Sequence, residues 1–115
     1  MIDKKTTVTR NTLELDGFAL CYAAGHAEGM TVTAEFILHD HYRPDRLWAR
    51  CGPIMDLMRG LHLESDEDTH KATVSISHNG ARLSATGQSL RVAVLRLFVL
   101  KELGATVEIP QSLLV

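Results

Sequence analysis

Arginine and aromatic side chains are concentrated between His41 and Pro53, in the stretch HYRPDRLWARCGP. An arginine guanidinium is a planar group of donors that matches phosphate or carboxylate, and tyrosine and tryptophan rings are surfaces on which a base stacks. This composition predicts a loop that binds an anion carrying a flat ring. A structural alternative is that Trp48 anchors the core while the arginines are solvated or paired with Asp45 and Asp56. The predicted ligand contacts here are Tyr42, Arg43, Arg46, Trp48 and Arg50.

A second candidate group surrounds the start of the long apolar segment near the C-terminus, at TGQSLR. Free backbone N–H groups at a helix N-terminus bind anions. Arg96 follows amid apolar residues, and burying an unpaired guanidinium costs roughly several kcal/mol. It therefore needs either an ion pair with Glu14 or Glu102, or a ligand. The predicted ligand contacts in this group are Gln88, Ser89, Arg91 and Arg96.

Histidines and acidic residues raise the question of a metal site. His39 and His41 would lie on one side of an extended strand, with His62, His70 and the acidic stretch 64–68 nearby. Their spacing matches neither a zinc motif nor a calcium loop, so we expect no metal and interpret 64–68 as a solvated turn. The chain also lacks a Walker loop, a dinucleotide-binding glycine loop and a serine elbow. We therefore expect no catalytic residue and no cofactor; an enzyme acting on nucleotides through His39 or His41 is the least favoured hypothesis.

The composition is that of one ordinary globular domain covering residues 1–115. Hydrophobic residues make up 45% and charged residues 23%, and the net charge is -2, so no attraction to long nucleic acid or to a membrane surface is expected. No apolar run approaches the roughly 20 residues of a membrane span, and MIDKKTTVTRN lacks the apolar core of a signal peptide. These features predict a cytoplasmic protein whose Cys21 and Cys51 are reduced thiols, with Cys21 in the core.

Several elements can be expected from local patterns. Asn11 and Thr12 are good helix caps, and apolar residues then recur at helical spacing, which predicts a helix over 13–28. Apolar alternation over 31–38 predicts a strand. Pro53 suits the first turn of a short helix over 53–59, and Leu61 with Leu63 predicts a short strand.

The clearest local pattern is a β-hairpin. Asn79-Gly80 is the preferred pair for a two-residue hairpin turn, and apolar residues alternate on both sides of it. The register places all these apolar residues on one face, because it pairs His78 with Ala81, Ile76 with Leu83 and Val74 with Ala85.

A helix over 88–103 is expected next, ended by Gly104 and followed by a strand over 105–110. This helix is apolar nearly all round, which is typical of a helix covered on several sides. With the apolar tail 113–115 it exceeds what one small sheet can cover, so we expect a homo-oligomer. The predicted fold is α+β: a small antiparallel sheet with a β-hairpin packed against two main helices.

Three stretches resemble the NinX-like family of small phage proteins. YRPDRLWARCGPIMD is similar to that family's pattern at Tyr42, Pro44, Trp48, Ala49, Gly52 and Pro53. The region from Leu15 to Gly29 and the ending SLRVAVLRLFVLKELGATVEIPQSLL are also similar. Leu47 and Cys51 differ, since the family usually has Asp and Gly there. The resemblance implies a phage accessory protein in the cytoplasm of the host bacterium, without implying an activity.

These observations together predict a non-enzymatic phage protein that sequesters a nucleotide-like small molecule to counter host defence signalling. The alternative is an inhibitor that docks on a host enzyme through its arginine and aromatic side chains, because arginine, tyrosine and tryptophan are also the commonest interface anchors.

Overall fold

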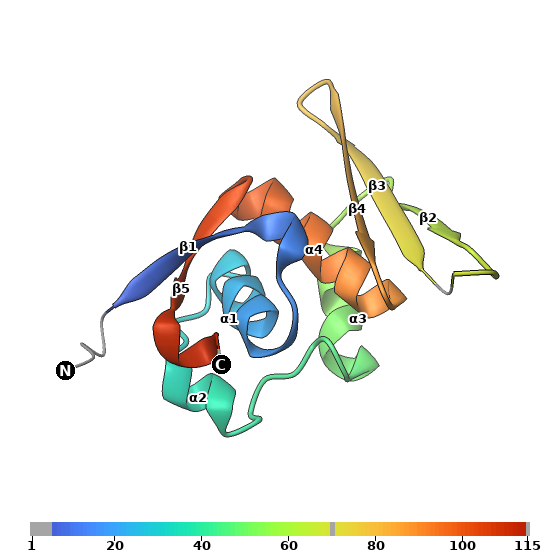
Figure 1. The fold of residues 1–115 in the computed structure, drawn as a ribbon. Coiled ribbons are helices and arrows are strands. Elements are labelled where there is room, and N and C mark those ends of the chain that lie inside the picture. Colours follow the sequence, from blue (N-terminus) through green and yellow to red (C-terminus); the bar gives the residue numbers. More distant parts are fainter. Residues whose placement is uncertain (1–5, 70, 115) are drawn as a thin grey trace.

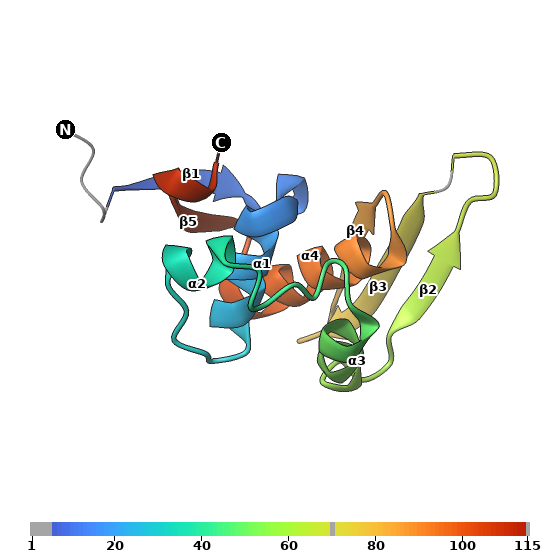
Figure 2. The same cartoon turned by 90° about the horizontal axis from the view of Figure 1, so that it is seen from below.

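The computed structural model describes residues 6–69 and 71–114, which form an α+β fold with two small antiparallel sheets (Figure 1). β1 (Thr7–Asn11) pairs with β5 (Thr106–Pro110). β2 (His62–Ser65), β3 (Ala72–His78) and β4 (Ala81–Gly87) form the other sheet, in the order β2-β3-β4. The predicted α+β class is confirmed, but the strands form two separate sheets on either side of the central helices (Figures 1 and 2).

α4 (Leu90–Leu103) is the centre of the molecule. α1 (Gly17–Ala27), α3 (Trp48–Asp56), β3 and β4 all pack against it (Figure 2). Its buried residues are Ala93, Val94, Leu95, Leu97, Phe98 and Val99. Other parts of the same chain therefore cover the apolar surface from which we expected a homo-oligomer. The oligomer stays a prediction, but this helix no longer supports it.

The ends of α4 follow from its capping residues. Helix geometry begins at Leu90 rather than at 88, because the Ser89 hydroxyl accepts a hydrogen bond from the N–H of Val92 and caps the helix. Gly104 ends it as predicted, with a φ of 96° that favours glycine. The expected strand after it is β5. β1, its partner, was not predicted.

The hairpin of β3 and β4 has the predicted register, from Ala72 opposite Gly87 to His78 opposite Ala81. Asn79 and Gly80 both have positive φ, of 53° and 79°, as a two-residue primed turn requires. The apolar face of the hairpin packs on α4. β4 ends at Gly87, shortly before α4 begins at Leu90.

The predicted helix over 13–28 begins later than expected. Asn11 does act as a cap, since its side chain accepts from the N–H of Leu13, but it caps only the 3-10 turn η1 (Thr12–Glu14). Gly17 has a φ of 53°, outside right-handed helical geometry, and the turn therefore does not continue into α1.

The strand predicted over 31–38 is wrong, because this region contains the short helix α2 (Ala34–Leu38). Thr33 caps it by accepting from the N–H of Phe36. Ile37 is buried, whereas Phe36 and Leu38 are exposed, which reverses the predicted faces. A short alternating run also fits one turn of helix, and the capping threonine decided between the two.

The short helix predicted over 53–59 is instead α3, which spans Trp48–Asp56 and contains Pro53. Proline has no N–H to donate to the carbonyl four residues earlier, which is that of Ala49. Ala49 is exposed, so water can replace that bond. The short strand near Leu63 is confirmed as β2, and it includes Glu64 and Ser65 of the predicted acidic turn.

Candidate functional site

Arg43, a predicted ligand contact, points into the protein. Only 6% of it is exposed. Its Nη1 donates to Asp40 at 2.9 Å, and its Nε and Nη2 donate to Asp45 at 3.0 and 2.9 Å. Its guanidinium lies 4.5 Å from the centre of the Phe18 ring. The hydrogen bond to Asp45 is the largest effect that raises the pKa of Arg43. Arg43 therefore has a structural role in this fold.

Asp45 joins the segment around Arg43 to α1. The Cys21 thiol donates to its carboxylate at 3.0 Å, and burial raises the pKa of this thiol to about 12, so it stays a donor. Burial opposes the ionisation of Asp45, but the donors Arg43 and Cys21 outweigh it and lower its pKa. Tyr42 is also buried and donates to Glu28 beside α1. The polar groups of Tyr42 and Arg43 thus stabilise the core.

Trp48 lies at the surface with 46% of its area exposed, so it is not the core anchor of the structural alternative. The guanidinium of Arg91 lies 5.0 Å from the centre of its ring. The Arg91 Nε donates to the backbone carbonyl of Asp45 at 3.1 Å. The two predicted groups of ligand contacts, in the loop 41–53 and at the start of α4, therefore contact each other directly. We call Arg46, Leu47, Trp48 and Arg91 the Trp48 patch.

A pocket of about 260 Å³ lies at the junction of β4 and α4, and we call it the α4 pocket. The predicted residues Gln88 and Arg96 line it, together with Asp16, Lys71, Thr86, Gly87 and Val92. Sequence reasoning missed Lys71, since nothing local indicates that it meets α4. The pocket combines two cationic side chains with one carboxylate, from segments far apart in the chain.

Arg96 is fixed at the wall of the α4 pocket by backbone carbonyls. Its Nε donates to Leu15 at 2.7 Å, and its Nη1 donates to Thr86 at 2.8 Å. The ion pair expected with Glu14 or Glu102 is therefore replaced by two neutral acceptors. Neither acceptor is charged, and no salt bridge engages the Arg96 guanidinium within residues 6–69 and 71–114, although Asp16 lines the same pocket.

Gly87 makes the close approach of β4 to α4 feasible. A Cβ at this position would lie 2.7 Å from the backbone nitrogen of Ala93 and 2.9 Å from the Val92 side chain. The predicted contact Ser89 is engaged as the cap of α4. Glycine at 87 thus lets Gln88 follow the strand directly into the pocket wall.

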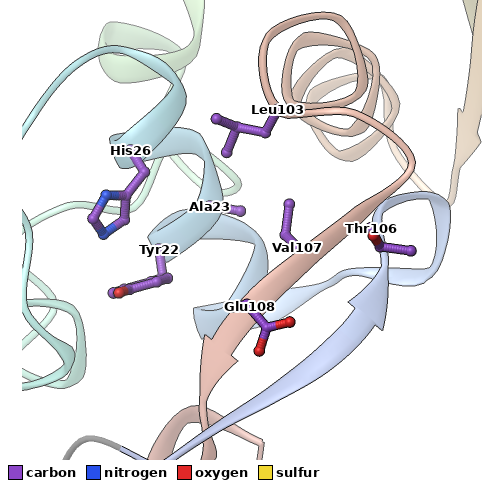
Figure 3. A pocket seen from close by; sticks show the side chains of 7 residues that line it. All are labelled: Tyr22, Ala23, His26, Leu103, Thr106, Val107 and Glu108. Carbon is purple, nitrogen blue, oxygen red and sulfur yellow. The ribbon is translucent and has the colours of Figure 1, made fainter.

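A further pocket, of about 320 Å³, lies between α1, the end of α4 and β5 (Figure 3). We call it the edge pocket. Its lining residues are Tyr22, Ala23, His26, Leu103, Thr106, Val107 and Glu108. The Tyr22 and His26 rings lie 4.4 Å apart on one face of α1. Their spacing of four residues was visible in the sequence, but their position beside β5 was not.

The remaining candidates do not gather into a further site. Arg50 is exposed on α3. His39 and His41 follow α2, with rings 6.1 Å apart, rather than standing on a strand. Within residues 6–69 and 71–114, no three His, Cys, Asp or Glu side chains are grouped as metal ligands. His70 and Val115 lie outside the described residues.

None of the described helices is both long and apolar enough to cross a membrane. In comparisons with known proteins, the chain matches no family model and no curated protein. The resemblance to NinX-like phage proteins therefore stays a prediction.

Proposed function

We propose that this protein binds a small nucleotide-like anion in the α4 pocket and does not convert it chemically. The observation that carries this proposal is the convergence of Lys71 and Arg96 on one pocket. A hydrogen bond to a charged group contributes about 1.5–3 kcal/mol, so two cations together give a substantial gain. Asp16, which lines the same pocket, opposes part of this attraction.

The support of Arg96 favours binding. Because the carbonyls of Leu15 and Thr86 already hold its guanidinium, little side-chain entropy is lost when an anion arrives. Lys71 supplies a compact charge on a flexible stem. The amide of Gln88 can both donate and accept, which suits a base or a sugar hydroxyl attached to the anion.

The biological part of the proposal is sequestration. A phage protein that captures a nucleotide-like messenger would counter host defence signalling from within the host cytoplasm. Support for this part comes from the resemblance to small phage proteins, combined with a pocket suited to holding an anion.

Calorimetry with a panel of linear and cyclic nucleotides tests the proposal. We expect at least one to bind more tightly than about 1 mM, and Lys71→Gln to weaken binding at least about tenfold. The control is Lys101→Gln, which removes the same charge where Lys101 pairs with Glu102 near the opposite end of α4. No binding by the wild type, or equal loss in both variants, would contradict the proposal.

A second candidate function is docking on a host enzyme through the Trp48 patch. Leu47 is 53% exposed beside the half-exposed Trp48, and Arg91 and Arg46 flank them. Exposed tryptophan and arginine are common interface anchors. This candidate predicts that Trp48→Ala abolishes capture of a host enzyme while Lys71→Gln retains it. The opposite pattern would favour the α4 pocket.

A further inference from the structure

β5 is paired along only one of its edges in the two-stranded sheet that it forms with β1. Two hydrogen bonds just beyond the strand ends show which residues of β5 direct their backbone groups toward β1. The N–H of Gln111 donates to Thr6 at 3.1 Å, and the N–H of Thr12 donates to Ala105 at 2.9 Å. Odd-numbered residues of this segment therefore direct their N–H and C=O groups toward β1.

Alternate residues of an antiparallel strand direct these groups to opposite edges. Thr106 and Glu108 accordingly direct their backbone N–H and C=O groups away from β1. Both residues are exposed, and within residues 6–69 and 71–114 no hydrogen bond engages these backbone groups. This open edge matters because unpaired strand edges are templates for another strand.

The edge pocket lies beside this open edge. Figure 3 shows Leu103 and Ala23 on one side of β5, close to Val107, with Tyr22 and His26 further out on α1. Leu103 is 42% exposed although it ends the central helix α4. A strand added to this edge would direct alternate side chains toward the edge pocket.

The opposite face of β5 has a different character. The Glu108 carboxylate accepts hydrogen bonds from the hydroxyls of Thr9 and Thr7 on β1. These bonds, led by that from Thr9, lower the pKa of Glu108, so it is ionised at neutral pH. A residue facing Glu108 across the added strand would therefore best be basic.

We propose that the open edge of β5 binds an extended peptide of a partner protein by strand addition. In this peptide an apolar side chain enters the edge pocket and a basic side chain lies opposite Glu108. Strand addition takes its affinity from main-chain hydrogen bonds and its specificity from pockets for alternate side chains.

A second copy of this chain fits the edge less well. Antiparallel pairing of two β5 strands would place two Glu108 carboxylates opposite or diagonal to each other on one face. Like charges in such positions destabilise a strand pair. Charge complementarity therefore favours a basic partner peptide.

Amide hydrogen exchange tests this proposal. In the free protein we expect slow exchange at Val107 and Ile109, which face β1, and fast exchange at Thr106 and Glu108. The probe is a pool of blocked heptapeptides in which lysine or arginine alternates with valine or leucine. It should slow exchange at Thr106 and Glu108 at least about tenfold. Protection of these two amides in the free protein, or no slowing by the pool, would overturn the proposal.

Two variants at one position separate backbone from charge. Glu108→Pro removes both the charge and the outward N–H, which does not bond to β1, and proline is tolerated at such edge positions. Glu108→Gln removes only the charge. We expect peptide affinity to fall about five- to tenfold in Glu108→Gln and by a further factor of about five to ten in Glu108→Pro. A control pool with glutamate in place of the basic residues should bind at least about tenfold more weakly to the wild type. Leu103→Ala, a change at an exposed site, should also weaken binding. It provides the test if proline at position 108 disturbs the fold. Unchanged affinity in Glu108→Gln and Leu103→Ala would refute the assigned contacts. None of these changes touches the α4 pocket, so its proposed anion binding stands or fails separately.

Discussion

The guanidinium of Arg91 lies over the indole of Trp48, 5.0 Å from the ring centre, while its Nε donates to the backbone carbonyl of Asp45. These contacts join the first turn of α4 to the first residue of α3. A cation in the first turn of a helix is unfavourable against the helix dipole, and the indole face and the carbonyl offset that cost. The Arg91–Trp48 pair thus connects α4 with α3 and also forms part of the exposed Trp48 patch.

Replacing Arg91 should show how much its contacts with Trp48 and Asp45 contribute to the free energy of unfolding. Arg91→Ala should lower the free energy of unfolding by about 1–2 kcal/mol, since both a hydrogen bond and a cation–π contact are lost. Urea unfolding gives the energy, and tryptophan fluorescence should report a more solvated Trp48. Arg46→Ala is the matched control, with an expected change within about 0.5 kcal/mol. Equal effects in the two variants would mean that neither the hydrogen bond nor the cation–π contact of Arg91 stabilises the fold.

Arg43 should matter for stability. Arg43→Ala leaves Asp45 without the two donors that neutralise it, and removing one partner of a buried pair costs about 3–5 kcal/mol. If Arg43 were instead a ligand contact, as the sequence predicts, this variant would keep its fold and lose only ligand binding. Arg50→Ala, at an exposed position, is the control for loss of charge. A melting temperature that does not change in Arg43→Ala would favour the predicted role of Arg43 as a ligand contact.

Asp45 should make stability depend on acidity. Because its pKa is lower in the folded protein than in the unfolded chain, its contribution is present above the ordinary pKa of about 4 and is lost as pH falls through the folded value. Unfolding curves between neutral and strongly acidic pH should show this loss. Asp45→Asn should be less stable at neutral pH and should lose less on acidification. Parallel pH profiles for the two proteins would exclude this role.

Two glycines give opposite predictions. Gly87→Ala should destabilise by about 1–3 kcal/mol, because its Cβ meets the backbone of α4 and cannot be accommodated by a side-chain shift. Gly52→Ala should stabilise by about 0.5–1 kcal/mol, since Gly52 lies within α3 and its Cβ would meet nothing within 4 Å. Thermal melts of both variants provide the measurement. A neutral Gly87→Ala would show that β4 and α4 are less tightly joined than described.

Local chemistry decided which elements were predictable. The hairpin was correct in every pair because Asn79-Gly80 and the alternation around it agree on one register. Thr33, in contrast, turned an alternating run into helix α2, and the left-handed Gly17 delayed α1. In both places a single capping or turn residue outweighed the apolar periodicity on which the prediction was based.

The candidate site was predictable only as far as its chemistry is local. Gln88 and Arg96 were identified from the start of α4 and from an arginine among apolar neighbours. Lys71 was missed because only the folding of β3 and β4 brings it to the same pocket. For Arg43 the sequence left two roles open, ligand contact or pairing with Asp45; the structure shows the pairing with Asp45 and adds Asp40, which is reached because the side chain turns inward.

The location of a bound anion tests the central claim most directly. Titration of isotope-labelled protein with adenosine monophosphate, followed by NMR, should shift the amides of Gly87 and Gln88 and the Nε–H of Arg96 along one saturable curve with a Kd below about 1 mM. Lys71→Gln should raise this Kd at least about tenfold, whereas Lys101→Gln should leave it unchanged. Shifts confined to the Trp48 indole, or none at all, would contradict anion binding in the α4 pocket.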